Sequence, residues 1–100
     1  MYHYVYILEN QDDKSLYIGY TTDLKRRVDE HNEGKGGRTT KNKLHSNLSR
    51  GVATKLKKNW KLIYFEGYIV KLDALGREKF LKSGSGRKYI YKQLAYYLSE

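Results

Sequence analysis

Leu16-Tyr17-Ile18-Gly19 is a short apolar stretch that ends at a glycine, and it precedes a predicted helix over Asp23–Glu33. Thr21, Thr22 or Asp23 is able to cap that helix, and Gly34 is suited to end it. At about 100° per residue, one arc of the helix mixes apolar and polar residues. Its members are Leu24, Val28, Arg27 and His31. Polar residues on a face that should point inward need a partner or a chemical task.

The composition limits the class of protein. One hundred residues are enough for a single small domain, 1–100, without a second core. The absence of cysteine excludes disulfides and thiolate metal sites. Because no long apolar run or signal peptide is evident, we expect a soluble cytoplasmic protein that does not contact a membrane.

The net charge of +9 is concentrated in one stretch. Nine Lys or Arg residues and no Asp or Glu lie between Gly34 and Phe65, while the other eleven basic residues balance eleven acidic ones. A localised basic segment favours a nucleic-acid partner, and a solubility surface rich in lysine is the alternative. We predict that a basic insertion around residues 35–59, of undecided conformation, contacts DNA through Lys35, Arg38, Lys41, Lys43, Lys55, Lys57 and Lys58.

The remaining pattern predicts an α/β (α+β) domain. Residues 2–8 and 15–20 are rich in β-formers and are joined by a polar turn, which is typical of an antiparallel hairpin. The order β-β-α-(basic insertion)-β-α-α then gives a small three-stranded sheet, with this β-hairpin, flanked by helices. Its later elements are a strand over Trp60–Tyr68, a helix capped by Asp73 and running to about Lys82, a break at 83–86, and a last helix over Arg87–Leu98.

Five polar side chains should share an inward-facing surface: Tyr6, Tyr17, Arg27, His31 and Glu78. A carboxylate binds a divalent cation, an arginine stabilises charge on a pentacovalent phosphate, and a phenol or imidazole takes a proton from water. Together they suit phosphodiester hydrolysis with one metal ion. Each also has a structural interpretation: core tyrosines, an Arg27–Glu78 ion pair, and a satisfied helix histidine.

Two ordered sets of residues resemble a known family. Tyr4-Val5-Tyr6, Tyr17-Ile18-Gly19, Asp23 to Arg27 and His31-Asn32 together resemble the GIY-YIG nuclease family, with Tyr4 where the family name has glycine. Trp60 to Glu66 and Arg77 to Gly84 are similar to small stand-alone bacterial members, which are related to the N-terminal domain of the excision-repair incision subunit. The resemblance covers nearly the whole chain.

The resemblance implies a role for each inward residue. Gly19 would let the backbone run close to its neighbours. The water-activating base stays open, because a phenol has an ordinary pKa of about 10 and an imidazole one near 6.5. The implied roles are motif tyrosines for Tyr6 and Tyr17, a contact to the scissile phosphate for Arg27, a histidine present in several branches for His31, and a ligand of Mg²⁺ or Mn²⁺ for Glu78.

The function expected from these observations is a divalent-metal-dependent DNA endonuclease, a hydrolase acting in repair, recombination or mobile-element biology. A bacterial member would associate with the nucleoid and could have a larger repair or recombination partner. Two alternatives stay open: a binding module that uses the same scaffold without cleaving, and a structural domain with a vestigial site.

Overall fold

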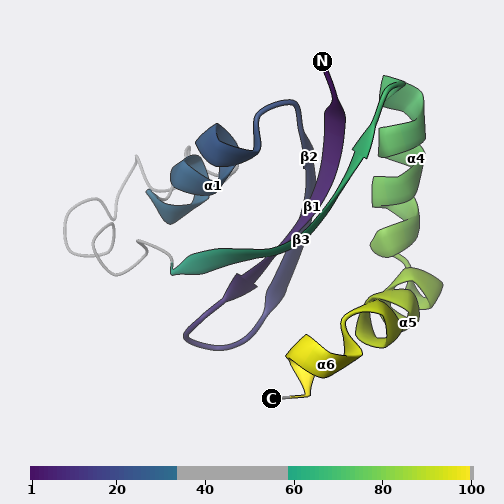
Figure 1. The fold of residues 1–100 in the computed structure, drawn as a ribbon. Coiled ribbons are helices and arrows are strands. Elements are labelled where there is room, and N and C mark those ends of the chain that lie inside the picture. Colours follow the sequence, from purple (N-terminus) through teal and green to yellow (C-terminus); the bar gives the residue numbers. More distant parts are fainter. Residues whose placement is uncertain (34–58, 100) are drawn as a thin grey trace, which may run out of the picture.

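The structure, a computed structural model, describes residues 1–33 and 59–99 (Figure 1). The predicted DNA contacts from Lys35 to Lys58 therefore lie outside the described residues. The described elements are β1 (His3–Asn10), β2 (Leu16–Thr21), α1 (Leu24–Asn32), β3 (Trp60–Tyr68), α4 (Lys71–Leu81), α5 (Gly84–Gln93) and α6 (Ala95–Leu98).

The three strands form one antiparallel sheet in the order β2-β1-β3. Tyr6, on the central strand, is paired with Gly19 of β2 and with Phe65 of β3. Residues paired directly across antiparallel strands point to the same face, so these three positions share one face. The predicted hairpin and third strand are confirmed, and β3 runs antiparallel to β1.

The alternation of β1 divides the domain into layers. Val5 and Ile7 point into the main core, where they are fully buried with Ala74, Leu81 and Ile90 of the later helices. Tyr6 points the opposite way, toward His31 of α1. Helix α1 therefore covers one face of the sheet and α4, α5 and α6 cover the other (Figure 1). Burial on both faces explains why β1 lacks a simple polar and apolar alternation.

A polar cluster is built into the layer of α4. The Glu66 carboxylate of β3 accepts hydrogen bonds from Arg77 Nε at 2.9 Å and Nη2 at 3.1 Å. The hydroxyls of Tyr64 and Tyr68 donate to the same carboxylate, each at 2.5 Å. Burial raises the pKa of Glu66, but these hydrogen bonds outweigh it and hold that pKa below its usual range. The cluster fixes α4 against β3.

Helix α4 begins before the predicted cap. Val70 occupies the N-cap position and makes no side-chain hydrogen bond there, so the prediction of Asp73 as cap is wrong. Asp73 lies instead in the first turn, where a carboxylate interacts favourably with the helix dipole.

The predicted break at 83–86 is shorter in the structure, because α4 ends at Leu81 and α5 already begins at Gly84. The Ser83 hydroxyl accepts a hydrogen bond from the Gly86 amide at 3.1 Å and caps the helix. A Cβ atom at Gly86 would stand 2.7 Å from the carbonyl carbon of Phe80. Glycine there allows two helices to meet at a sharp corner. The predicted last helix is further divided at Leu94, between α5 and α6.

Candidate functional site

The centre of the site is a hydrogen bond between β1 and α1. The Tyr6 hydroxyl lies 3.1 Å from His31 Nε2, and both side chains are buried. When the neutral imidazole carries its proton on Nδ1, the hydroxyl donates to Nε2. Of the three predicted caps, Asp23 is the N-cap of α1, and its carboxylate accepts from the Arg26 amide at 3.1 Å. His31 follows two turns later and is buried.

Gly19 makes room for the Tyr6 ring. A Cβ atom at Gly19 would overlap the Tyr6 hydroxyl, would stand 2.6 Å from Tyr6 Cζ and would lie 3.0 Å from Tyr17 Cε2. The phenol of Tyr6 therefore extends over the backbone of the neighbouring strand, and only glycine permits that approach. The family resemblance implied a close approach of the backbone to its neighbours at Gly19.

Tyr17 and Trp60 surround the other side of His31. The Tyr17 ring centroid is 4.5 Å from that of His31, and the Trp60 centroid is 6.3 Å from it. The Asn32 side chain donates to the Trp60 carbonyl at 3.2 Å and accepts from the Trp60 amide at 2.6 Å. These two bonds join the end of α1 to the start of β3, so the imidazole is held between aromatic rings.

Arg27 lies one turn before His31 and is half-buried. Its Nη1 donates to Glu30 at 3.1 Å. Its Nε is buried and has no hydrogen-bond partner among the described residues. An unpaired guanidinium N–H inside a protein is costly unless a ligand completes it. The group could complete its hydrogen bonds with a phosphate.

Glu78 lies in a different layer from the other predicted site residues. It belongs to α4, on the sheet face opposite α1, and its carboxylate accepts from Lys82 Nζ at 3.0 Å. The described ion pairs join Glu78 to Lys82 and Arg27 to Glu30, so the proposed Arg27–Glu78 ion pair is not formed. Glu78 nevertheless acts on Tyr6 electrostatically, because its charge raises the pKa of that hydroxyl.

The electrostatics of the central pair favour neutral groups. Burial, followed by the nearby Tyr17, raises the pKa of Tyr6 well above its usual value of about 10, although the Arg27 charge opposes the change. Burial and then the Arg27 charge lower the pKa of His31, with Glu30 opposing them. Near neutral pH the imidazole is therefore an unprotonated acceptor and the phenol an intact donor.

The described residues offer little protein coordination for a metal ion. They contain no cluster of three or more His, Asp or Glu side chains able to hold one. Two carboxylates act on Tyr6 through their charge: Glu30, which is bonded to Arg27, and Glu78, whose side chain is 20% exposed. One carboxylate still fits Mg²⁺, which keeps several waters and is often completed by substrate phosphates.

The prediction that the five residues share one inward-facing surface is wrong for Glu78, which belongs to α4 on the other face of the sheet. Tyr6, Tyr17, His31 and Arg27 gather between the sheet and α1, and Glu78 is linked to them by charge alone. A cavity of 440 Å³ lies elsewhere, beside Lys14, Lys61 and Tyr97, and none of the five lines it.

Sequence reasoning missed three residues around the site. Lys82 lies four positions after Glu78, the spacing at which helical side chains meet. Phe65 and Trp60 stand in the predicted third strand, and their face follows only once the register is known. A period-two count along that strand would fail because its register shifts opposite Ile7 and Leu8.

The chain is similar to known proteins of one family. A model of the GIY-YIG catalytic domain matches residues 2–90. A UPF0213 protein of Haloquadratum walsbyi is 40% identical over 87 residues, which is 87% of this chain and 81% of that protein. A UPF0213 protein of Streptococcus pneumoniae is 40% identical over 79 residues, or 79% of this chain and 65% of that protein, so the chain spans slightly less than two thirds of its length. The solution NMR structure of a UPF0213 protein from Bacillus halodurans is 36% identical and covers 95% of this chain and 83% of that one, with a TM-score of 0.48.

The fold and the site define a class: a small α+β domain of nuclease type, with two tyrosines, a histidine and an arginine between its sheet and first helix. The chain belongs to the GIY-YIG family. Among the described residues, no helix is long and apolar enough to cross a membrane.

Proposed function

We propose that the chain is a divalent-metal-dependent endonuclease that hydrolyses phosphodiester bonds in DNA. The observation that carries this proposal is the buried Tyr6–His31 hydrogen bond beside the unpaired Nε of Arg27. A proton acceptor and an unfulfilled cation are the two groups that hydrolysis of a phosphodiester needs at one place. The Arg27 charge acts on both members of the pair, through the pKa values of Tyr6 and His31.

The proton path runs through Tyr6 to His31. With its pKa raised, Tyr6 is a poor base on its own. A water molecule bound at the Tyr6 hydroxyl can pass a proton to that oxygen while the hydroxyl passes its own proton to His31 Nε2. His31, neutral at the start because its pKa is lowered, is then the final acceptor. Water becomes hydroxide as it attacks phosphorus, the P–O bond to the leaving strand breaks, and the leaving oxygen takes a proton from a solvent water molecule.

Arg27 stabilises the phosphate. Its guanidinium, on a side chain that is 32% exposed, can donate to a non-bridging oxygen, and the charge that this oxygen gains in the transition state makes the contact stronger there. The neighbouring Glu30 holds the guanidinium through Nη1, and Nε has no partner among the described residues.

Glu78 would hold the divalent cation, Mg²⁺ or Mn²⁺. When bound, that ion supplies positive charge to the phosphate and the leaving oxygen. We also propose a cytoplasmic, nucleoid-associated role in DNA repair, recombination or mobile-element processing, with a larger repair partner unspecified. The net charge of +9 supports DNA as the partner.

One observation favours the second candidate, a DNA-binding module without cleavage. Lys82 Nζ lies 3.0 Å from Glu78 and places an ammonium at the carboxylate proposed for the metal. A single carboxylate neutralised in this way is a weak cation ligand. The two functions differ in whether Glu78 is needed for cleavage.

A nicking assay on supercoiled, branched and single-stranded DNA with Mg²⁺ or Mn²⁺ tests the proposal. Glu78→Ala should abolish cleavage with DNA binding kept or improved, because a carboxylate repels phosphate unless a cation lies between them. Arg27→Ala should lower the rate by about 10²–10³. Asp73→Ala on the same helix as Glu78 and Arg26→Ala next to Arg27 are matched controls, since both side chains are exposed. If the parent cuts no DNA and binds it normally, the binding-module function is correct.

A further inference from the structure

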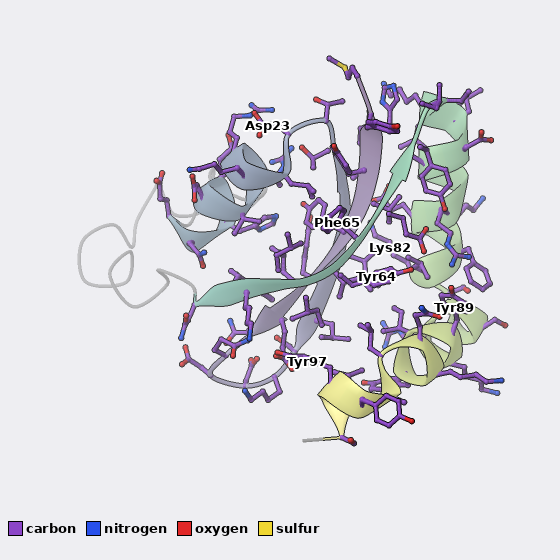
Figure 2. The ribbon with its side chains drawn as sticks, in the orientation of Figure 1. Asp23, Tyr64, Phe65, Lys82, Tyr89 and Tyr97 are labelled. Atoms are coloured by element: carbon purple, nitrogen blue, oxygen red, sulfur yellow. The ribbon has the colours of Figure 1, made fainter. Side chains whose placement is uncertain are left out.

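Aromatic rings are exposed on the face of the sheet to which Tyr6 points. Phe65 is 52% exposed and Tyr2 is 51% exposed. The Tyr4 and Phe65 ring centroids lie 5.9 Å apart at 74°, and those of Tyr2 and Tyr4 lie 6.2 Å apart at 39°. Figure 2 labels Phe65 on the side of the sheet nearer α1. Single exposed apolar residues need no explanation, but three adjoining rings form a surface; we call Tyr2, Tyr4 and Phe65 the aromatic platform.

The aromatic platform is continuous with the candidate site. Phe65 is the direct partner of Tyr6 across the sheet, and Tyr4 precedes Tyr6 by two residues on the same face. Two residues of a strand span about 7 Å. The rings of Tyr2 and Tyr4 lie over Gly67 of β3, where a Cβ atom would stand 3.4 Å from Tyr4 Cε1. The aromatic platform therefore adjoins Tyr6 on the face of the sheet that carries the candidate site.

We propose that the aromatic platform stacks an unpaired base of the DNA strand whose phosphate lies at Arg27, which rests on the nuclease function proposed above. Every base has a π-face, and exposed aromatic rings on a sheet suit stacking with bases that are not already paired. Bases inside a duplex are stacked on one another and cannot offer that face. The substrate is thus single-stranded or locally unpaired DNA. The charge of +9 favours a polyanion over a second copy of the same cationic chain.

Binding without metal tests this proposal separately from cleavage. Fluorescence polarisation in EDTA would compare a labelled single-stranded oligonucleotide with its duplex, for the parent chain and for Phe65→Leu and Phe65→Trp. Tyr96→Leu is the matched control, because Tyr96 is 92% exposed on α6, on the other side of the sheet. Phe65→Leu should weaken single-strand binding by about 5- to 100-fold and duplex binding much less, whereas Phe65→Trp should retain both. The control should bind like the parent.

An abasic scan of the oligonucleotide adds a readout from the DNA side. One abasic position should weaken binding by the parent chain, and the same abasic position should weaken binding by Phe65→Leu very little further. The two changes are not additive because each removes the same contact between the ring and the base. Equal single-strand affinity of Phe65→Leu and the parent, or equal loss on single strand and duplex, would overturn the proposal. So would a change of oligomeric state in Phe65→Leu, since the platform would then be an interface between copies. If no DNA is cut but the base-specific loss is found, the nuclease function fails and the platform stands.

Discussion

Gly19→Ala is the substitution that probes the candidate site most directly. The space that the added methyl group needs is already filled by Tyr6 and Tyr17. The added Cβ would overlap the Tyr6 hydroxyl, stand 2.6 Å from its Cζ and press on Tyr17 at 3.0 Å. These distances are well inside ordinary van der Waals contact, so the Tyr6 ring must move. That movement lengthens the 3.1 Å bond from Tyr6 to His31.

The expected size of the effect follows from the burial of Tyr6, which is 1% exposed. Forcing a methyl group into a packed interior costs about 1–3 kcal/mol. For a chain of this size, such a loss lowers the melting temperature by about 5–20 °C. Because a displacement of about 1 Å at a catalytic group can reduce the rate 10²-fold, nicking should fall by about that factor.

Gly76→Ala is the matched control, since a Cβ atom there meets nothing within 4 Å. In the interior of α4 it should raise the stability by about 0.5–1 kcal/mol and leave nicking unchanged. Thermal melts, nicking rates and the NMR shifts of the His31 ring would be measured for both variants. A Gly19→Ala protein that melts, cuts and positions His31 like the parent would refute the packing argument.

Four further predictions use other parts of the molecule. The pKa of His31 is lowered in the folded chain, so the unfolded chain binds more protons once the pH falls below about 6.5. The free energy of unfolding should therefore decrease as the pH falls from that value. In His31→Gln this dependence on pH should be largely absent. Arg77→Met should lower the free energy of unfolding by about 3 kcal/mol, because it leaves the largely buried Glu66 without its cation. Lys25→Ala breaks an exposed pair with Asp29 and should lower it by under about 1 kcal/mol in the same thermal melts. Lys82→Met should reduce by several-fold the Mg²⁺ concentration needed for half-maximal nicking, and an increase would show that Lys82 contacts the DNA instead. Alanine at Lys55, Lys57 and Lys58 should weaken binding to all DNA sequences alike and reduce the salt slope, and an unchanged slope would show that this charge serves solubility.

The parts of the fold that the sequence predicted depend on local signals. The hairpin, the Asp23 cap and the third strand all follow from β-formers, turn residues and a capping side chain that lie near one another in the chain. The start of α5 did not follow. A Ser-Gly-Ser-Gly stretch is typical of a loop, and it is helical here because Ser83 caps it and Gly86 fits against the end of α4.

Helix periodicity predicts part of the candidate site. Arg27 and His31 share one stripe of α1, which predicts that both face the sheet. Periodicity did not decide the face of Tyr6, because β1 is buried on both faces and lacks a polar and apolar alternation. The orientation of α4, which carries Glu78, was not predictable in this way. The neighbouring Arg77 pairs with Glu66, eleven residues away, and that contact decides the orientation of α4 through tertiary packing alone.

The two faces of the sheet carry polar clusters with different roles. Glu66 accepts hydrogen bonds from Tyr64 and Tyr68 of its own strand and from Arg77, whose bonds attach α4 to the sheet. On the opposite face, the Tyr6–His31 pair is kept neutral and Arg27 keeps a buried N–H without a protein partner. A fully satisfied cluster stabilises a fold, whereas an incompletely satisfied one is retained for a ligand. The face beneath α1 is therefore where binding and chemistry should be sought, and the cluster at Glu66 is the support that holds the helix carrying Glu78 in place.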